Sequence, residues 1–167
     1  MTTTYVALLR GVNVGGRVLR MEELRSVCAS LGLAEARTYI QSGNVVFRGE
    51  AADGTRLAKA LAVPVLLRTT EEMAAVVAAN PFPGQGADPK RLHVTFLAAE
   101  PTREAPAADS GPDEFILAGR EVYLHCPGGY GETKLHNAFF ERRLGVTATT
   151  RNWATVQKLA EMAGTAD

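Results

Sequence analysis

A glycine-rich segment near the N-terminus carries the residues best suited to bind an anion. It reads Arg10-Gly11-Val12-Asn13-Val14-Gly15-Gly16-Arg17 and lies between an apolar run and a segment of helical spacing. The backbone N–H groups of such a loop, with an arginine at each end, can bind phosphate or carboxylate oxygens. We predict that the ligand-binding residues of this loop are Arg10, Asn13, Gly15, Gly16 and Arg17.

The spacing within this loop also bears on nucleotide hydrolysis. Gly11 and Gly16 are separated as in the phosphate-binding pattern G-x-x-x-x-G-K-[ST]. Arg17 replaces the lysine of that pattern, and Val18 stands where a hydroxyl would bind magnesium. The sequence therefore favours a simple anion-binding loop, or a purely structural turn, over a nucleotide hydrolase.

Two further cationic positions lie where helices are expected to start. Lys134 follows a second glycine-rich run and is predicted to lie in a helix with Thr133 as its cap, while Arg151 and Asn152 precede the last helix. Helix N-termini attract anions because their first N–H groups are unpaired. We predict that Lys134, Arg151 and Asn152 complete one positive groove with the N-terminal loop.

Catalytic and metal-binding patterns are weak elsewhere. His125 and Cys126 are adjacent, so on a strand their side chains point to opposite faces and cannot form a nucleophile–base pair. His93, His125 and His136 lack the spacing of a zinc site. We predict no metal and no cofactor, the catalytic residues stay unassigned, and the sequence does not decide whether the protein is an enzyme.

Composition narrows the class of protein. The 167 residues include 18 Lys or Arg and 18 Asp or Glu, so no overall positive field would hold a polyanion without selectivity. Two cysteines, Cys28 and Cys126, are too few for a disulfide framework. The start of the chain lacks a signal-peptide pattern, and no apolar run is long enough to span a membrane. We expect a cytoplasmic protein that does not associate with membranes.

The hydrophobic pattern predicts the elements that must position these residues. Predicted strands lie at 5–9, 38–42, 45–48, 63–67, 92–97, 114–118, 121–125 and 146–149, and predicted helices at 21–31, 102–109, 134–144 and from 152 onwards. Asp53 is expected to cap another helix, and Thr69 with Glu72 forms a capping-box signature. Gly43-Asn44 and Gly119-Arg120 are predicted to form two-residue hairpin turns.

The same order of elements occurs twice. Strand-helix-strand-strand-helix-strand predicts an α+β protein of two ferredoxin-like (βαββαβ) halves with mainly antiparallel sheets and an extra C-terminal helix. We place the first half at 1–69, a helix and linker at 70–90, and the second half with the C-terminal helix at 91–167. Cys28 and Phe47 are predicted core residues, and Trp153 is predicted to be a core or interface anchor rather than a base-stacking platform.

Several segments resemble a known family over nearly the whole chain. They are 7–16, 39–47, 80–83, 127–131, 134–135 and 148–153, which include Asn80-Pro81-Phe82-Pro83 and Ala148-Thr149-Thr150-Arg151-Asn152-Trp153. In this order they resemble the signatures of the bacterial family known as domain of unknown function 1697. The resemblance implies a bacterial cytosolic protein with two ferredoxin-like halves and no established activity or cofactor.

Two functions from different classes remain open at this stage. The first is a binding module for an anionic, phosphate-bearing ligand such as a nucleotide or single-stranded nucleic acid. The alternative is a protein-interaction or structural module without a small-molecule ligand, in which the arginines pair with Glu22, Glu23 or Glu132. The sequence does not predict an oligomeric state.

Overall fold

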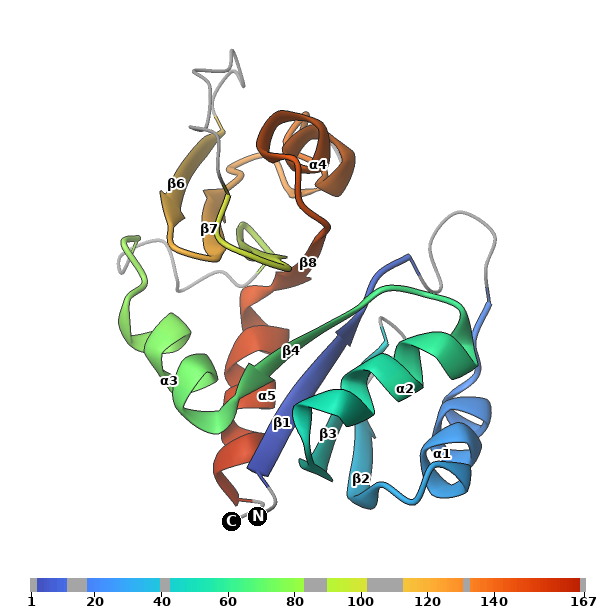
Figure 1. Cartoon of the computed structure of the whole chain (residues 1–167). Coiled ribbons are helices and arrows are strands. Elements are labelled where there is room, and N and C mark those ends of the chain that lie inside the picture. Colours follow the sequence, from blue (N-terminus) through green and yellow to red (C-terminus); the bar gives the residue numbers. More distant parts are fainter. Residues whose placement is uncertain are drawn as a thin grey trace. The chain divides into compact units, whose positions relative to one another are not determined.

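A computed structural model describes residues 3–11, 18–39, 43–82, 90–101, 113–130 and 133–165 (Figure 1). These residues form an α+β protein with two four-stranded antiparallel sheets and five helices, the last of them C-terminal. The elements are β1 (Thr3–Leu9), α1 (Met21–Ser30), β2 (Ala34–Tyr39), β3 (Asn44–Gly49), α2 (Ala51–Leu61), β4 (Val65–Thr69), α3 (Thr70–Ala78), β5 (Leu92–Leu97), β6 (Glu114–Ala118), β7 (Glu121–His125), α4 (Asn137–Leu144), β8 (Ala148–Asn152) and α5 (Trp153–Thr165).

The chain divides into two compact units. The first comprises Met1–Ala75 together with Lys158–Asp167, and the second comprises Val76–Gln157. The boundaries of the units therefore fall within α3 and α5. The three-part division expected from the sequence stays a prediction, and the expected helix at 102–109 lies outside the described residues.

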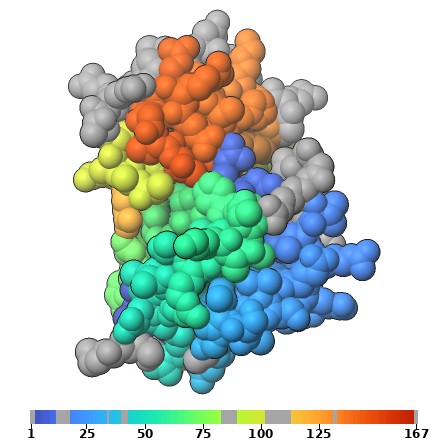
Figure 2. Space-filling model, turned by 45° about the vertical axis from the view of Figure 1, so that its right-hand side comes forward, coloured from blue at the N-terminus to red at the C-terminus, as the bar shows by residue number. Residues whose placement is uncertain are grey.

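The first unit is built on a sheet of strand order β2-β3-β1-β4. Alternate residues of β1 and β3 face α1 and α2, which lie side by side on one face of this unit (Figure 2). The core between them consists of Ala7, Leu9, Leu19, Leu24, Cys28, Leu33, Val45, Phe47, Leu57, Leu61 and Val63. Cys28 and Phe47 thus lie in the core as predicted, and burial raises the pKa of the Cys28 thiol.

The hairpin between β2 and β3 is present, but the predicted turn at Gly43-Asn44 is wrong. Tyr39 pairs directly with Asn44, so Asn44 lies within the strand pair and not in a two-residue turn. Asn44 is fully buried, and its Nδ2 donates to the Tyr39 carbonyl at 3.0 Å. The Gly43 carbonyl accepts a hydrogen bond from the N–H of Leu9 at 2.9 Å. These contacts hold Asn44 in the ladder, and Gly43, with φ of +82°, supplies the left-handed residue before it.

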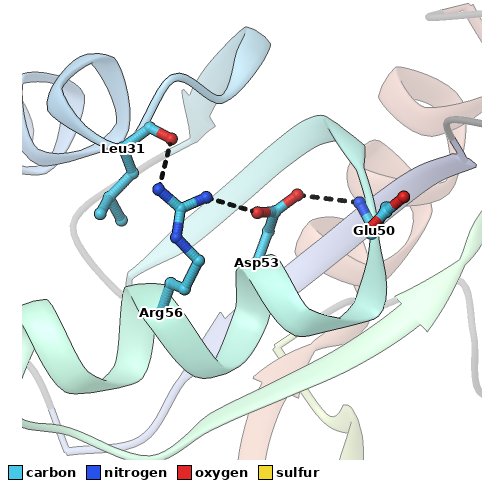
Figure 3. Close-up of polar contacts among 4 residues, drawn as sticks. All are labelled: Leu31, Glu50, Asp53 and Arg56. Atoms are coloured by element: carbon cyan, nitrogen blue, oxygen red, sulfur yellow. Dashed lines mark hydrogen bonds and ion pairs between the residues drawn. The ribbon is translucent and has the colours of Figure 1, made fainter.

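A polar network at the start of α2 connects this helix to the end of α1 (Figure 3). The Asp53 carboxylate accepts from the Glu50 N–H at 2.9 Å and from Arg56 at 2.7 Å. The second nitrogen of the Arg56 fork donates to the Leu31 carbonyl at 2.9 Å. The hydrogen bond from Glu50 is the main cause that holds the pKa of Asp53 below its ordinary value. Asp53 therefore satisfies an exposed N–H from inside the first turn, three residues after the N-cap.

The second unit repeats the sheet order of the first, as β6-β7-β5-β8. Ala118 pairs with Glu121, which confirms the predicted two-residue turn at Gly119-Arg120, and Gly119 has φ of +63°. One face of the sheet packs against α4 through Leu97, Val122, Leu124, Cys126, Leu135, Phe140, Leu144 and Ala148.

Both β4 and β8 lead into a helix without an intervening loop. At the β4–α3 junction, Thr69 and Glu72 form the predicted capping box, with bonds of 2.8 and 3.1 Å. At the β8–α5 junction, the Asn152 side chain accepts from the Thr155 N–H at 2.8 Å, which confirms Asn152 as an N-cap. Trp153 follows directly and is 4% exposed, so its predicted burial is also confirmed.

Candidate anion-binding site

The N-terminal part of the predicted site lies where β1 ends. Arg10 is half-buried, and its N–H donates to the Pro64 carbonyl at 3.0 Å. Gly11 follows with φ of +78°, and no described atom lies within 4 Å of the position that a Cβ would occupy. Asn13, Gly15, Gly16 and Arg17 lie outside the described residues. The structure therefore places the first arginine of the loop, and the rest of the loop stays a prediction.

Lys134 is exposed, but the prediction that it lies in a helix is wrong. Helix α4 begins at Asn137, and its N-cap is His136, whose backbone is extended. Thr133 does act locally, because its Oγ1 accepts from the Leu135 N–H at 3.1 Å. In this short turn the Leu135 N–H is bonded to Thr133, whereas in a helix starting at Lys134 it would point along the helix axis. Lys134 thus precedes the helix start instead of belonging to it.

Arg151 is buried, with 5% of its surface exposed. Its Nη1 donates to Thr149 Oγ1 at 2.7 Å and to the Thr150 carbonyl at 3.0 Å. Burial lowers the pKa of Arg151 to about 10, which leaves the guanidinium protonated at neutral pH. The contacts described for Arg151 lie within its own strand, and ligand binding by this residue stays a prediction.

A second buried arginine, which the sequence did not single out, is Arg68 on β4, with 1% exposure. Its Nη1 donates to the carbonyl of the preceding residue, Leu67, at 2.9 Å, as Arg151 does to Thr150. Both arginines directly precede the residue that caps the next helix. The shared signal in the sequence is therefore an arginine, a capping residue and a helix at the same place in each half.

In the second unit, polar side chains gather on the sheet face that packs against α4. Thr95 Oγ1 lies 2.7 Å from Thr150 Oγ1, which donates to Asn137 Oδ1 at 2.6 Å. Because the single hydroxyl hydrogen of Thr150 is used in that bond, Thr95 is the donor of the pair. This chain of hydrogen bonds ties the middle of the sheet to the first residue of α4.

The rings of His93, Tyr130 and His136 lie beside this chain of hydrogen bonds. His93 is two residues from Thr95 on the same face, and the Tyr130 ring stacks on it with centroids 4.7 Å apart. Tyr130 also meets the edge of His136, at 5.9 Å. His93 is 7% exposed, and burial lowers its pKa from 6.5 to about 4, so the imidazole is neutral at pH 7.

Metal and thiol chemistry find little support in the described part of the chain. No group of three or more His, Cys, Asp or Glu residues there could hold a metal ion. Cys28 and Cys126 are free and buried, and burial raises the pKa of both thiols. A buried protonated thiol is a poor nucleophile. Neither cysteine is therefore suited to act as a nucleophile in this structure.

The comparisons with known proteins agree with the resemblance in the sequence. The family described as "Protein of unknown function (DUF1697)" matches residues 1–123, so the chain belongs to the DUF1697 family. No curated protein matches the chain. A solved structure similar to it is the conserved bacterial protein SP0830 from Streptococcus pneumoniae, with a TM-score of 0.72 and 23% identity over 98% of this chain and 99% of that one. At this identity the likeness shows the fold alone.

The helices of the described residues do not have the character of membrane spans. Among those described, none combines the length and apolar character needed to cross a bilayer.

Proposed function

We propose that the protein is a binding module for a phosphate-bearing ligand, held by the loop that follows β1. The observation that carries this proposal is the position of Arg10 and Gly11. β1 is an inner strand, so the loop leaves from the middle of the sheet. A half-buried arginine followed by a left-handed glycine opens the segment in which the sequence predicts further donors.

The loop, rather than the helix start that follows it, is the proposed contact. Helix α1 has Arg20 as its N-cap, without a side-chain cap, and carries Glu22 and Glu23 in its first turn. Those carboxylates already complement the positive end of the helix and would repel a second anion there. The ligand is therefore assigned to the backbone N–H groups and arginines of the loop, with Asn13, Gly15, Gly16 and Arg17 taken from the sequence.

We also propose that each of the two units has the ferredoxin-like fold. Strand orders β2-β3-β1-β4 and β6-β7-β5-β8, each antiparallel, support a ferredoxin-like topology in both units. In the second unit the segment 102–112, outside the described residues, would have to supply the first helix. A bacterial, cytoplasmic setting and a nucleotide or single-stranded nucleic acid as ligand are also proposed on the sequence alone.

A thermal-shift titration tests this function. Nucleotides, short single-stranded RNA and DNA, and inorganic polyphosphate would each be added at low and at physiological salt. A ligand that binds only the folded protein raises its melting temperature, and phosphate contacts weaken as salt rises. We expect a salt-sensitive rise that Arg10→Glu abolishes and that the control Arg25→Glu, at an exposed position of α1, retains. No rise with any ligand would refute the proposal.

The alternative of a structural or protein-interaction module is favoured by one observation. Arg151 is buried and donates to Thr149 and Thr150, as an arginine that stabilises its own strand would. Under this alternative Arg151→Ala lowers the melting temperature and no anion in the panel raises it. A partner bound through an apolar surface would also bind with little dependence on salt.

A further inference from the structure

His93 has a buried nitrogen that no hydrogen bond satisfies. The side chain is more than nine-tenths buried, and its Nδ1 is among the few buried polar side-chain atoms of the described residues without a hydrogen-bond partner. Leaving such a group unpaired is unfavourable, so native proteins rarely keep one without a reason. A ligand that offers an acceptor to Nδ1 would recover this cost.

The surroundings of His93 lead to the start of α4 by two routes. Through rings, His93 stacks on Tyr130, which meets the edge of His136, the N-cap of α4. Through hydrogen bonds, Thr95 on the same face connects by way of Thr150 to Asn137, the first residue of α4. The unsatisfied imidazole therefore faces the side of the sheet on which the first turn of α4 lies.

The start of α4 is suited to an anion. The helix has eight residues, no acidic residue in its first turn, and no hydrogen bond from the His136 side chain to cap it. By contrast, α1, α2 and α3 carry acidic residues in their first turns, and Asn152 caps α5. Exposed Lys134 lies two residues before the N-cap and adds a positive charge. Glu141 lies one turn farther along α4. One oxygen of its carboxylate accepts a hydrogen bond from the Ala148 N–H at 3.0 Å.

We propose that the second unit holds a phosphate group at the start of α4, bound by His93 Nδ1, by Lys134 and by the first N–H groups of the helix. As a neutral imidazole, His93 donates the Nδ1 proton to a phosphate oxygen. The Tyr130 ring stacks on the imidazole with centroids 4.7 Å apart. The residues of this site belong to the second unit, whereas the loop after β1 belongs to the first, and the proposal goes beyond the function proposed above.

The test follows backbone amide and imidazole signals by NMR during titration with inorganic phosphate, with sodium chloride at equal ionic strength as a control. We expect saturable shifts confined to Lys134, Asn137 and their neighbours, and to the His93 side chain. A parallel titration with adenosine monophosphate distinguishes free phosphate from a phosphate monoester as the ligand. Equal affinities would indicate that free phosphate is sufficient, and tighter binding of the nucleotide would indicate a phosphate monoester whose organic part also contacts the protein.

Variants decide which groups bind. His93→Phe keeps a stacking ring but removes the nitrogen, and it should weaken phosphate binding at least tenfold. The matched control, His125→Phe, removes a half-buried imidazole whose buried Nδ1 also lacks a hydrogen bond, and it should leave the affinity unchanged. Lys134→Gln, at an exposed position, should weaken binding and reduce its salt dependence.

Two results would overturn the proposal. They are the absence of saturable shifts with phosphate, and equal affinities of wild type, His93→Phe and Lys134→Gln. Because Arg10 belongs to the first unit, Arg10→Glu should leave these shifts intact. The two proposed sites can therefore fail independently, and each failure is visible by itself.

Discussion

Acid should destabilise the protein through His93, and the substitution His93→Phe should remove that loss. Burial lowers the pKa of the folded imidazole from its ordinary 6.5 to about 4. Between these values the unfolded chain binds a proton that the folded protein does not. The free energy of unfolding therefore falls as pH decreases from 6.5 towards 4. Above pH 6.5 the contribution of His93 to stability is fully retained.

The size of this effect follows from the shift. Each pH unit in this interval is worth about 1.4 kcal/mol, so the whole interval amounts to about 3 kcal/mol. Other groups titrate over the same range, but they are common to wild type and variant and cancel in the difference between them. At pH 7.5 the variant should be as stable as wild type or slightly more so, because it no longer buries an unpaired nitrogen.

Urea unfolding at pH 7.5, 6.5, 5.5 and 4.5 measures this difference. With a slope of about 2 kcal/mol per molar urea, the midpoint of wild type should fall by about 1 M more than that of His93→Phe between the two extremes. His136→Phe, which removes an exposed imidazole next to Tyr130, should keep the steep dependence of wild type. If the midpoints of wild type and His93→Phe fall in parallel, His93 is not buried as a neutral group and the reasoning is wrong.

Three substitutions test the packing that supports the fold. Arg56→Ala removes the hydrogen bond to the Leu31 carbonyl and should cost about 1 kcal/mol in urea unfolding; no change would mean that water replaces the bond. Trp153→Ala should cost about 3–5 kcal/mol because the ring is buried, and a cost below 1 kcal/mol would contradict that burial. Gly54→Ala places a Cβ 2.6 Å from Leu67. The resulting strain of about 1–3 kcal/mol should exceed the gain of about 1 kcal/mol in helix propensity, so the variant should be less stable. A higher melting temperature would show that Leu67 moves aside easily.

Features that depend on neighbours in sequence were predictable. The Thr69–Glu72 capping box, the Asn152 N-cap and the Gly119-Arg120 turn each involve residues at most three positions apart. Their hydrogen bonds form within one turn of chain, so the residue types alone indicate them.

Features that depend on distant residues were not predictable in this way. Asn44 resembles a turn residue, but its place in the ladder is fixed by pairing with Leu8 on another strand. The start of α4 depends on a local turn at Thr133 that competes with the helix for the Leu135 N–H. The sequence indicates neither the register of a sheet nor the winner of such a competition.

The candidate site shows the same limit. The sequence singled out cations next to glycines, and Arg10 does lie at the end of a strand as that pattern suggests. Burial, which separates Arg151 from exposed Lys134, is decided by how the sheet is covered. The relation between Arg68 and Arg151 was detectable only by aligning the two halves on their capping residues, and His93 became a candidate only when its surroundings were known.

The end of α5 has a consequence for synthesis on the ribosome. Arg37 of β2 donates to the Met162 carbonyl, and Thr70 of α3 donates to the Ala163 carbonyl, so residues from 158 onwards complete the first unit. They are added 83 residues after Ala75. At about 5–20 residues per second, the first unit must wait roughly 4–17 s for its last segment to begin. During that interval the nascent chain lacks part of its own structure, and this is when a chaperone would bind it most readily.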